Sequence, residues 1–388
     1  MSLGPLPFRV FANPRAGLPG TVVLTDAGFR RARAAITSWP GYAPTPLRDL
    51  PWAAKAAGVA AVRMKDEGGR FGLGSFKALG GAWAVAQVLA HELARRGIAN
   101  AASGAELEAG RYAEATAPIT VTCATDGNHG RSVAWGARRF GCGCVIFVHE
   151  TVSQGRIDAI ARYGADVRRV PGTYDDAVRA AARTAAEHGW FVVSDTSWPG
   201  YTQVPVDVMQ GYRLMADEAL DQWQGAPPSH AFVQGGVGGV AAAVSVQLRS
   251  RVNPPPALIV AEPDRAACLL ASAEAGELTA IPGELDTLMA GLACGEPSLL
   301  AWQELSRAAA AFIAVPDDAA VACMRLLARQ NIVIGESGTA GLAALLLAAA
   351  DPAACAALGL TADSRVLLFG TEGATDPALY RQLVEGAA

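Results

Sequence analysis

Lys77 is the residue in this chain whose setting most clearly allows covalent chemistry. It follows a glycine-rich loop, 70–76, and it precedes an apolar stretch, 81–86, that is typical of a buried helix. A lysine in such a place is poorly solvated, so its amine loses a proton more easily and can attack an aldehyde to form a Schiff base. The alternative is a surface lysine at the start of a helix, which is the more common position for a lysine.

A second motif, 125–130, reads TDGNHG and directly follows an expected strand. Its glycines let the backbone approach a ligand closely. Asn128 can donate an amide hydrogen to an anionic oxygen, and Asp126 places a carboxylate beside it. The alternative is an ordinary turn, in which Asp-Gly and Gly-Asn pairs are frequent.

A third motif is rich in glycine and stands between an expected strand and a helical pattern. It consists of Gly235, Gly236, Val237, Gly238 and Gly239. Glycine turns at helix N-termini present free N–H groups to phosphate, so the motif predicts an anion site. It matches neither the P-loop nor a proper dinucleotide fingerprint. An acidic residue does follow at Glu262, which leaves dinucleotide binding as an alternative.

Three polar groups follow other expected strands or precede a helix. Thr371 can place a neutral hydroxyl against a heterocyclic nitrogen, or it can cap a helix. Asp195 is either a cap or a second carboxylate in the site. The segment 336–338 is either a cap or a wall of the site.

The elements that must position these residues alternate between short apolar strands and helices, which favours parallel sheets covered on both faces. Strands are expected at 61–65, 119–123, 145–148, 167–170, 190–194, 231–234, 258–261 and 366–369. Helices are expected at 76–96, 132–140, 154–163 and 175–188. The sequence therefore predicts an α/β protein with two open, mostly parallel twisted sheets. Ligands of such sheets bind outside the carboxyl ends of the strands, here in a cleft between two domains.

Composition is consistent with a globular protein of about two domains. The chain has 388 residues, of which 51% are hydrophobic and 18% charged, and its formal net charge is −4. No basic block alternates with aromatic residues, which argues against nucleic-acid binding. The first 20 residues contain no apolar core typical of a signal peptide. The most apolar run, 340–350, is too short to cross a bilayer and is expected to form a core helix.

The seven cysteines are scattered and do not form a disulfide framework. Cys142 and Cys144 have the wrong spacing for zinc, and no metal site is expected. A single bond between Cys268 and Cys294 is possible, but free buried thiols in a reducing cytoplasm are the expected state.

The order of these parts is informative: a reactive lysine, an asparagine loop, a glycine-rich phosphate loop and a late hydroxyl. It resembles the fold type II pyridoxal-phosphate enzymes, the tryptophan synthase β-like group that includes serine and threonine dehydratases. The residues that carry the likeness are 75–77, which read SFK, and 127–130, which read GNHG. The resemblance implies that Lys77 holds the cofactor covalently and that Asn128 contacts its 3′-oxygen. It also implies that 235–239 hold the phosphate and that Thr371 faces the ring nitrogen.

The chain departs from the dehydratase pattern in ways that resemble the diaminopropionate ammonia-lyase family. Ala78, Leu79 and Gly80 replace the usual x-Arg-Gly after the lysine, and Asp126 replaces a serine before Gly-Asn-His. Other segments that carry this likeness are 70–73, 209–212, 289–297 and 371–376. The phosphate loop contains more glycine than is usual for that family, which leaves room for a shifted substrate.

The resemblance implies α,β-elimination of D- or L-2,3-diaminopropionate to pyruvate and ammonia. A β-ammonium leaves as neutral ammonia but needs an anion to attract it, and Asp126 and Asp195 are the candidates. We expect Lys77 to take the α-proton from one enantiomer and Asp126 from the other. The alternatives are a serine, threonine or D-serine dehydratase of the same fold, a nicotinamide-dependent oxidoreductase and a non-catalytic binding protein.

The resemblance also sets expectations for organisation. Residues 1–82 and 206–388 are expected to form the large cofactor-binding domain, and 83–205 the smaller α/β domain. We expect a cytoplasmic homodimer whose partner is a small amino acid, with no role for a membrane or nucleic acid.

Overall fold

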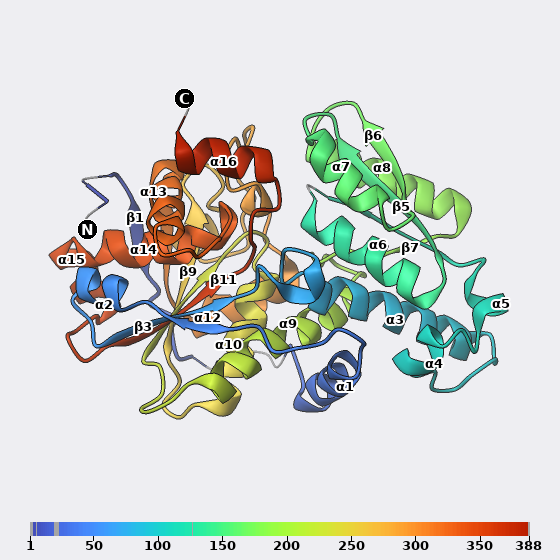
Figure 1. Ribbon diagram of the computed structural model, residues 1–388, viewed down its shortest axis with the longest axis horizontal. Coiled ribbons are helices and arrows are strands. Elements are labelled where there is room, and N and C mark those ends of the chain that lie inside the picture. Colours follow the sequence, from blue (N-terminus) through green and yellow to red (C-terminus); the bar gives the residue numbers. More distant parts are fainter. Residues whose placement is uncertain (1–2, 5, 19–22, 126, 387–388) are drawn as a thin grey trace. The chain divides into compact units, whose positions relative to one another are not determined.

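A seven-stranded sheet with five parallel central strands organises one part of the chain (Figure 1). The computed structural model describes residues 3–4, 6–18, 23–125 and 127–386. The strand order is β1-β10-β9-β8-β11-β3-β2, and the two edge strands β1 and β2 run antiparallel to their neighbours. The strands are β1 (Arg9–Ala12), β2 (Leu47–Asp49), β3 (Ala61–Asp66), β8 (His230–Gln234), β9 (Ala257–Pro263), β10 (Ala309–Val315) and β11 (Arg365–Gly370).

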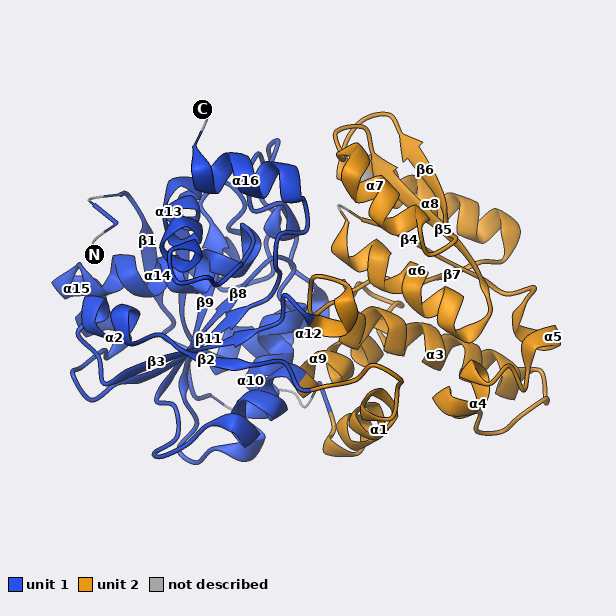
Figure 2. Ribbon diagram, in the orientation of Figure 1, with its two compact units in different colours: residues 1–24, 44–69, 215–388 blue, residues 25–43, 70–214 orange. Residues whose placement is uncertain are grey.

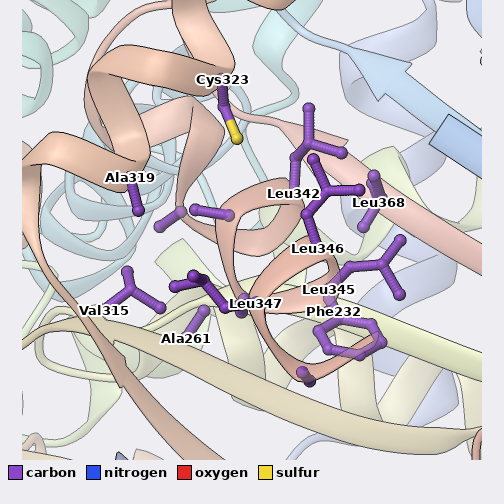
Figure 3. Close-up of a cluster of buried hydrophobic side chains, with 14 of the residues drawn as sticks. Phe232, Ala261, Val315, Ala319, Cys323, Leu342, Leu345, Leu346, Leu347 and Leu368 are labelled. Atoms are coloured by element: carbon purple, nitrogen blue, oxygen red, sulfur yellow. The ribbon is translucent and has the colours of Figure 1, made fainter. Parts of the chain in front are cut away.

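All residues of the central strand β8 are buried, so this strand is covered on both faces. A helix of nearly uniform apolarity, α14 (Ala340–Ala349), packs against β8, β9 and β10. Figure 3 shows its leucines among side chains of the sheet, such as Phe232 and Leu368, and of α13 (Asp317–Ala328). The expected core helix at 340–350 is therefore confirmed.

The other elements associated with this sheet are mostly helical. They are α2 (Pro51–Ala57), α10 (Gly239–Arg251), α11 (Cys268–Ala275), η2 (Ala290–Leu292), α12 (Leu299–Ala308), η3 (Ser337–Thr339), α15 (Pro352–Leu358) and α16 (Pro377–Glu385).

A four-stranded sheet, wholly parallel, organises the other part of the chain. Its order is β6-β5-β4-β7, with β4 (Thr120–Ala124), β5 (Gly143–His149), β6 (Asp166–Val170) and β7 (Phe191–Val192). The accompanying helices are α1 (Asp26–Thr37), η1 (Arg70–Gly72), α3 (Ala78–Arg95), α4 (Gly104–Glu108), α5 (Ala113–Thr116), α6 (Asn128–Phe140), α7 (Gln154–Ala161), α8 (Tyr174–His188) and α9 (Gln203–Gln222).

These two sheets belong to two compact units, coloured separately in Figure 2. The first unit contains 1–24, 44–69 and 215–388, and the second contains 25–43 and 70–214. The boundaries expected from the sequence were 82/83 and 205/206. Lys77 and α3 thus fall in the second unit by structure, whereas the sequence placed Lys77 in the larger domain.

The expected fold class is confirmed: two mostly parallel sheets carry helices, as in fold type II enzymes. Several elements were not expected. Strand β10 has the sequence AAAFIAV, and its alanines hide the strand pattern. Helix α1 was also not among the expected helices; Thr25 caps it by accepting from Gly28 N.

The helix that begins after Lys77 is held at close range by two neighbouring helices. A Cβ added at Gly81 of α3 would lie 1.9 Å from Ser132 Oγ of α6. A Cβ added at Gly211 of α9 would lie 1.9 Å from the carbonyl oxygen of Leu79. The two glycines therefore allow a close approach that no larger residue permits.

In the described part of the chain, no single helix is long and apolar enough to span a membrane. Only η3–α14 taken with α15, a pair bent by 115°, passes a test of length and composition.

We expect Leu345→Ala in α14 to lower the free energy of unfolding by about 2–5 kcal/mol, because it leaves a cavity in the core. Denaturant unfolding measures this change. The control is Leu18→Ala, since Leu18 is 52% exposed and its truncation should cost less than about 0.5 kcal/mol. Equal losses in the two variants would contradict the packing described for α14.

Candidate active site

Parallel pairing brings two of the predicted segments to one edge of the four-stranded sheet. Strands β4 and β7 pair through Val121↔Phe191 and Thr122↔Val192. Beyond the pairing, Val193 N donates to Thr122 O at 2.8 Å. The loop after β4, which begins at Thr125, and the loop after β7, which contains Asp195, therefore leave the sheet side by side.

Lys77 and Asp195 form an ion pair between Nζ and Oδ2. Both side chains are largely buried, with exposed fractions of 18% and 16%. The lysine Nζ also lies 5.2 Å from the ring centre of Phe76 and 5.6 Å from that of Tyr212. The predicted amine thus lies beside two aromatic rings and pairs with the Asp195 carboxylate.

The carboxylate of Asp195 stays ionised although it is buried. Burial acts to raise its pKa, but the positive charge of Lys77 and the hydrogen bond from Lys77 lower the pKa below its ordinary value. His129 lies farther away, with Nδ1 3.8 Å from Oδ2. A buried charge of this kind requires a cation next to it.

His129 is held neutral beside this pair. Burial, the largest effect, lowers the pKa of its imidazole. Its Nε2 lies 2.7 Å from the carbonyl oxygen of Val193, which can only accept, so Nε2 carries the proton.

The TDGNHG loop is held together by the hydroxyl of Thr125. Its Oγ1 accepts from the backbone N–H groups of Gly127 and Gly130, both at 3.0 Å. Gly127 has φ +147°, which a residue with a side chain rarely adopts. Asp126, predicted as the second base, lies outside the described residues.

Asn128 begins helix α6 and has a defined orientation. Arg131 Nη2 donates to Asn128 Oδ1 at 3.0 Å. Oδ1 therefore serves as an acceptor within the protein, and the amide nitrogen is the group suited to donate to an anionic oxygen.

In the first unit, the glycine motif forms the turn between β8 and α10. Gly238 has φ +95° and precedes the helix, whose N-terminus has no side-chain cap. A Cβ added at Gly235 would lie 2.6 Å from Val260 Cγ1, so the loop lies tightly against β9. Uncapped N–H groups at a helix start attract an anion, as the sequence predicted.

Thr371 follows β11 at the same edge of the large sheet, since β11 pairs in parallel with β8. It is buried, as is the next residue, Glu372. Glu372 Oε1 accepts from Ser337 N at 2.9 Å, and Ser337 Oγ accepts from Gly291 N at 3.1 Å. The segment 336–338 therefore supports the Thr371 loop and begins η3.

Glu262 is not available to a ribose, which removes the basis for dinucleotide binding. It is fully buried at the end of β9, and its two oxygens accept from Leu269 N and Leu270 N at 2.8 Å each. It therefore caps α11. Burial raises the pKa of this carboxyl to about 8, against the effect of the two hydrogen bonds.

All seven cysteines are free thiols, including Cys268 and Cys294. Burial raises the pKa of Cys268 well above its ordinary value and that of Cys142 to about 12. Among the described residues, no group of His, Cys, Asp and Glu is arranged to hold a metal ion.

Two residues near the predicted groups were not assigned a role from the sequence. Tyr212 belongs to the 209–212 segment that carried the family likeness, and its ring packs on Phe76 with centres 4.6 Å apart. Gln234 precedes the glycine motif, and its position at the end of a strand was the available signal.

Comparison with known proteins identifies the family. The profile described as "Pyridoxal-phosphate dependent enzyme" matches residues 38–369. The chain belongs to this family. It is 39% identical to a diaminopropionate ammonia-lyase of Escherichia coli K12 over 362 residues, which cover 89% of this chain and 88% of that protein.

Solved structures agree with this membership of the pyridoxal-phosphate dependent enzymes. A crystal structure of holo diaminopropionate ammonia lyase from Escherichia coli superposes with a TM-score of 0.90 at 36% identity, covering 99% of this chain and 97% of that one. A structure of the Escherichia coli enzyme in complex with D-serine gives a TM-score of 0.89 at 36% identity and covers 98% and 97% of the two chains.

The residues of this pyridoxal-phosphate dependent enzyme fit the cofactor. Lys77 supplies a largely buried primary amine beside two aromatic rings. The uncapped start of α10 and its glycine loop supply N–H donors for a phosphate. The expected cofactor, pyridoxal phosphate, is thereby supported by the chemistry of the donor groups as well as by the family.

We expect Thr125→Val to destabilise the protein by about 1–3 kcal/mol, since it leaves the N–H groups of Gly127 and Gly130 without their acceptor. Thr125→Ser keeps the hydroxyl and serves as the control. Thermal unfolding and turnover are measured for both variants. If the valine variant matches the serine variant in both, Thr125 does not hold the loop.

Proposed function

We propose that this chain is a lyase that eliminates ammonia from 2,3-diaminopropionate, in one or both enantiomeric forms, to give pyruvate and ammonia. One observation carries the choice of substrate: a buried carboxylate, Asp195, pairs with an ammonium. A substrate with a second ammonium group needs such a partner, whereas serine and threonine carry a neutral hydroxyl there. The similarity to diaminopropionate ammonia-lyases supports the same choice.

Bound pyridoxal phosphate supplies an electron sink that makes the α-proton of an amino acid removable. Lys77 would hold the cofactor covalently through Nζ, and Asn128 would donate to its 3′-oxygen. Gly235, Gly236, Val237, Gly238 and Gly239 would bind its phosphate. Thr371 would face the ring nitrogen with a neutral hydroxyl, which favours prompt loss of a β-substituent over transamination.

Asp195 has a further role in this proposal. Its carboxylate is kept ionised by a neighbouring cation, because burial without one is costly. When Lys77 is a neutral amine, the Asp195 carboxylate would lack its cation, and the β-ammonium of the substrate would take that place. The ammonium then leaves as neutral ammonia without an added proton.

Lys77 and Asp126 act as bases on opposite faces of the substrate in this proposal. Lys77 Nζ takes the α-proton of one enantiomer, and the Asp126 carboxylate takes that of the other. The support for Asp126 is its place in the TDGNHG motif, where the related dehydratases carry a serine.

The substrate is tested by pyruvate release from D- and L-diaminopropionate, from D- and L-serine and from L-threonine. We expect kcat/KM to be at least about tenfold higher for one diaminopropionate enantiomer than for the hydroxy-amino acids. A higher value for serine or threonine would identify the chain as a dehydratase. An ultraviolet–visible spectrum without the yellow band of bound pyridoxal phosphate would overturn the cofactor assignment.

The two bases are tested by Lys77→Ala and Asp126→Asn. Lys77→Ala should abolish turnover of both enantiomers, because it removes the covalent anchor. Asp126→Asn should reduce kcat for one enantiomer by about 10²–10⁴-fold and leave the other within about tenfold. Equal losses for both enantiomers would show that Asp126 is not a second base.

A homodimer in the cytoplasm remains a prediction. The resemblance to fold type II enzymes supports the dimer. The free state of all seven cysteines supports a reducing compartment.

A further inference from the structure

Gln234 is a buried polar residue between the end of strand β8 of the large sheet and the glycine motif. It is the last residue of β8, with an exposed fraction of 1%, and Gly235 follows it directly. A buried carboxamide is costly unless its polar atoms are hydrogen-bonded, so its contacts are informative.

The two strands beside Gln234 separate at this point. Strand β8 remains paired with β9 through Gln234↔Ala261, but its pairing with β11 ends at Phe232↔Leu368. The carbonyl oxygen of Phe369 therefore lies beyond the part of β11 that pairs with β8, although β11 still pairs with β3 there. Gln234 Nε2 donates to this oxygen at 2.5 Å, so the side chain joins β8 to β11 where the backbone pairing of these two strands has stopped.

The second contact of Gln234 reaches a third segment. Nε2 also donates to the carbonyl oxygen of Gly338 in η3, at 2.8 Å. Both amide hydrogens are thus used, which fixes the orientation of the carboxamide because carbonyls only accept. Oε1 is buried without a hydrogen-bond partner among the described residues. Leaving Oε1 buried without a partner costs free energy. The two hydrogen bonds that Nε2 donates are therefore the contribution of Gln234 to the fold.

The three segments joined in this way all carry groups of the site. The glycine motif begins at Gly235, Thr371 lies two residues after Phe369, and η3 supports the Thr371 loop through Ser337 and Glu372. A neutral side chain with two donors on one nitrogen suits two converging carbonyls. A carboxylate would face them with repulsion, and an apolar group would leave both oxygens unpaired.

We propose that Gln234 is a positioning residue that holds the phosphate loop and Thr371 in the relative arrangement needed to bind one pyridoxal phosphate. This inference rests on the cofactor roles given under the proposed function. It adds a residue that touches neither the phosphate nor the substrate and acts through the backbone on either side of it.

The test measures the dissociation constant of pyridoxal phosphate for the apoprotein, by titration followed through absorbance and intrinsic fluorescence. Gln234→Met keeps the length of the side chain and removes both donors, and we expect it to raise the dissociation constant by about tenfold or more. The matched control is Gln247→Met. Gln247 is equally buried in the same unit, and its Nε2 donates to Asp217 Oδ1 at 2.8 Å. Its cofactor affinity should stay within about twofold of the wild type.

Gln234→Glu keeps the shape of the side chain and gives a second readout. A buried glutamate titrates near neutral pH, and its protonated form can donate one hydrogen bond. We therefore expect this variant to bind the cofactor weakly at about pH 8 and more tightly at about pH 6. The ratio of its dissociation constants at these two pH values should exceed the ratio for Gln234→Met.

Wild-type affinity in Gln234→Met, or an equal loss in Gln247→Met, would overturn the proposal, since either shows that the donors do not position the loop. The proposal is also overturned if the cofactor dissociation constants of Gln234→Glu and Gln234→Met depend on pH in the same way. Failure of the proposed function is recognised separately, from measurements on the wild-type protein. In that case no pyruvate forms from diaminopropionate, or reduction with borohydride leaves no cofactor attached to Lys77.

Discussion

Parallel strand pairing is the constraint on which the candidate site depends. Neighbouring parallel strands end at the same edge of a sheet, so loops distant in the chain are brought together there. In the second unit this places the Thr125 loop beside Asp195. In the first unit it places the glycine motif beside Thr371. Each unit therefore carries several of its candidate site groups at or just after the ends of its strands.

The charges of the site follow from burial. Lys77 and Asp195 are each costly to bury alone, and each is the partner that makes the other acceptable. Two aromatic rings lie near the lysine amine, and partial burial strengthens the attraction between the two charges. A site built in this way can exchange one ammonium for another without rebuilding its walls, which suits a substrate that itself carries two amino groups.

Much of this arrangement could be predicted from the sequence, because apolar runs and glycine turns are local signals. The strands that precede the Thr125 loop, the glycine motif and Thr371 were located to within a residue or two. The pairing of Lys77 with Asp195 could not be predicted from spacing, since they are 118 positions apart and only the tertiary packing of the unit brings them together. The clamp made by Gln234 depends on where β8 and β11 diverge, which is a tertiary property. Strand β10 was not predicted, because alanine favours helix in isolation and sheet pairing overrides that preference.

The close packing of α3 has a consequence for how this enzyme can diversify. With Gly81 against Ser132 and Gly211 against the backbone of Leu79, the scaffold behind Lys77 has no slack for a single larger side chain. A larger side chain at either glycine therefore requires a compensating shift or substitution in the neighbouring helix. New substrate preferences are left to arise in the segments that follow the strands, where an altered residue leaves the amine in its place.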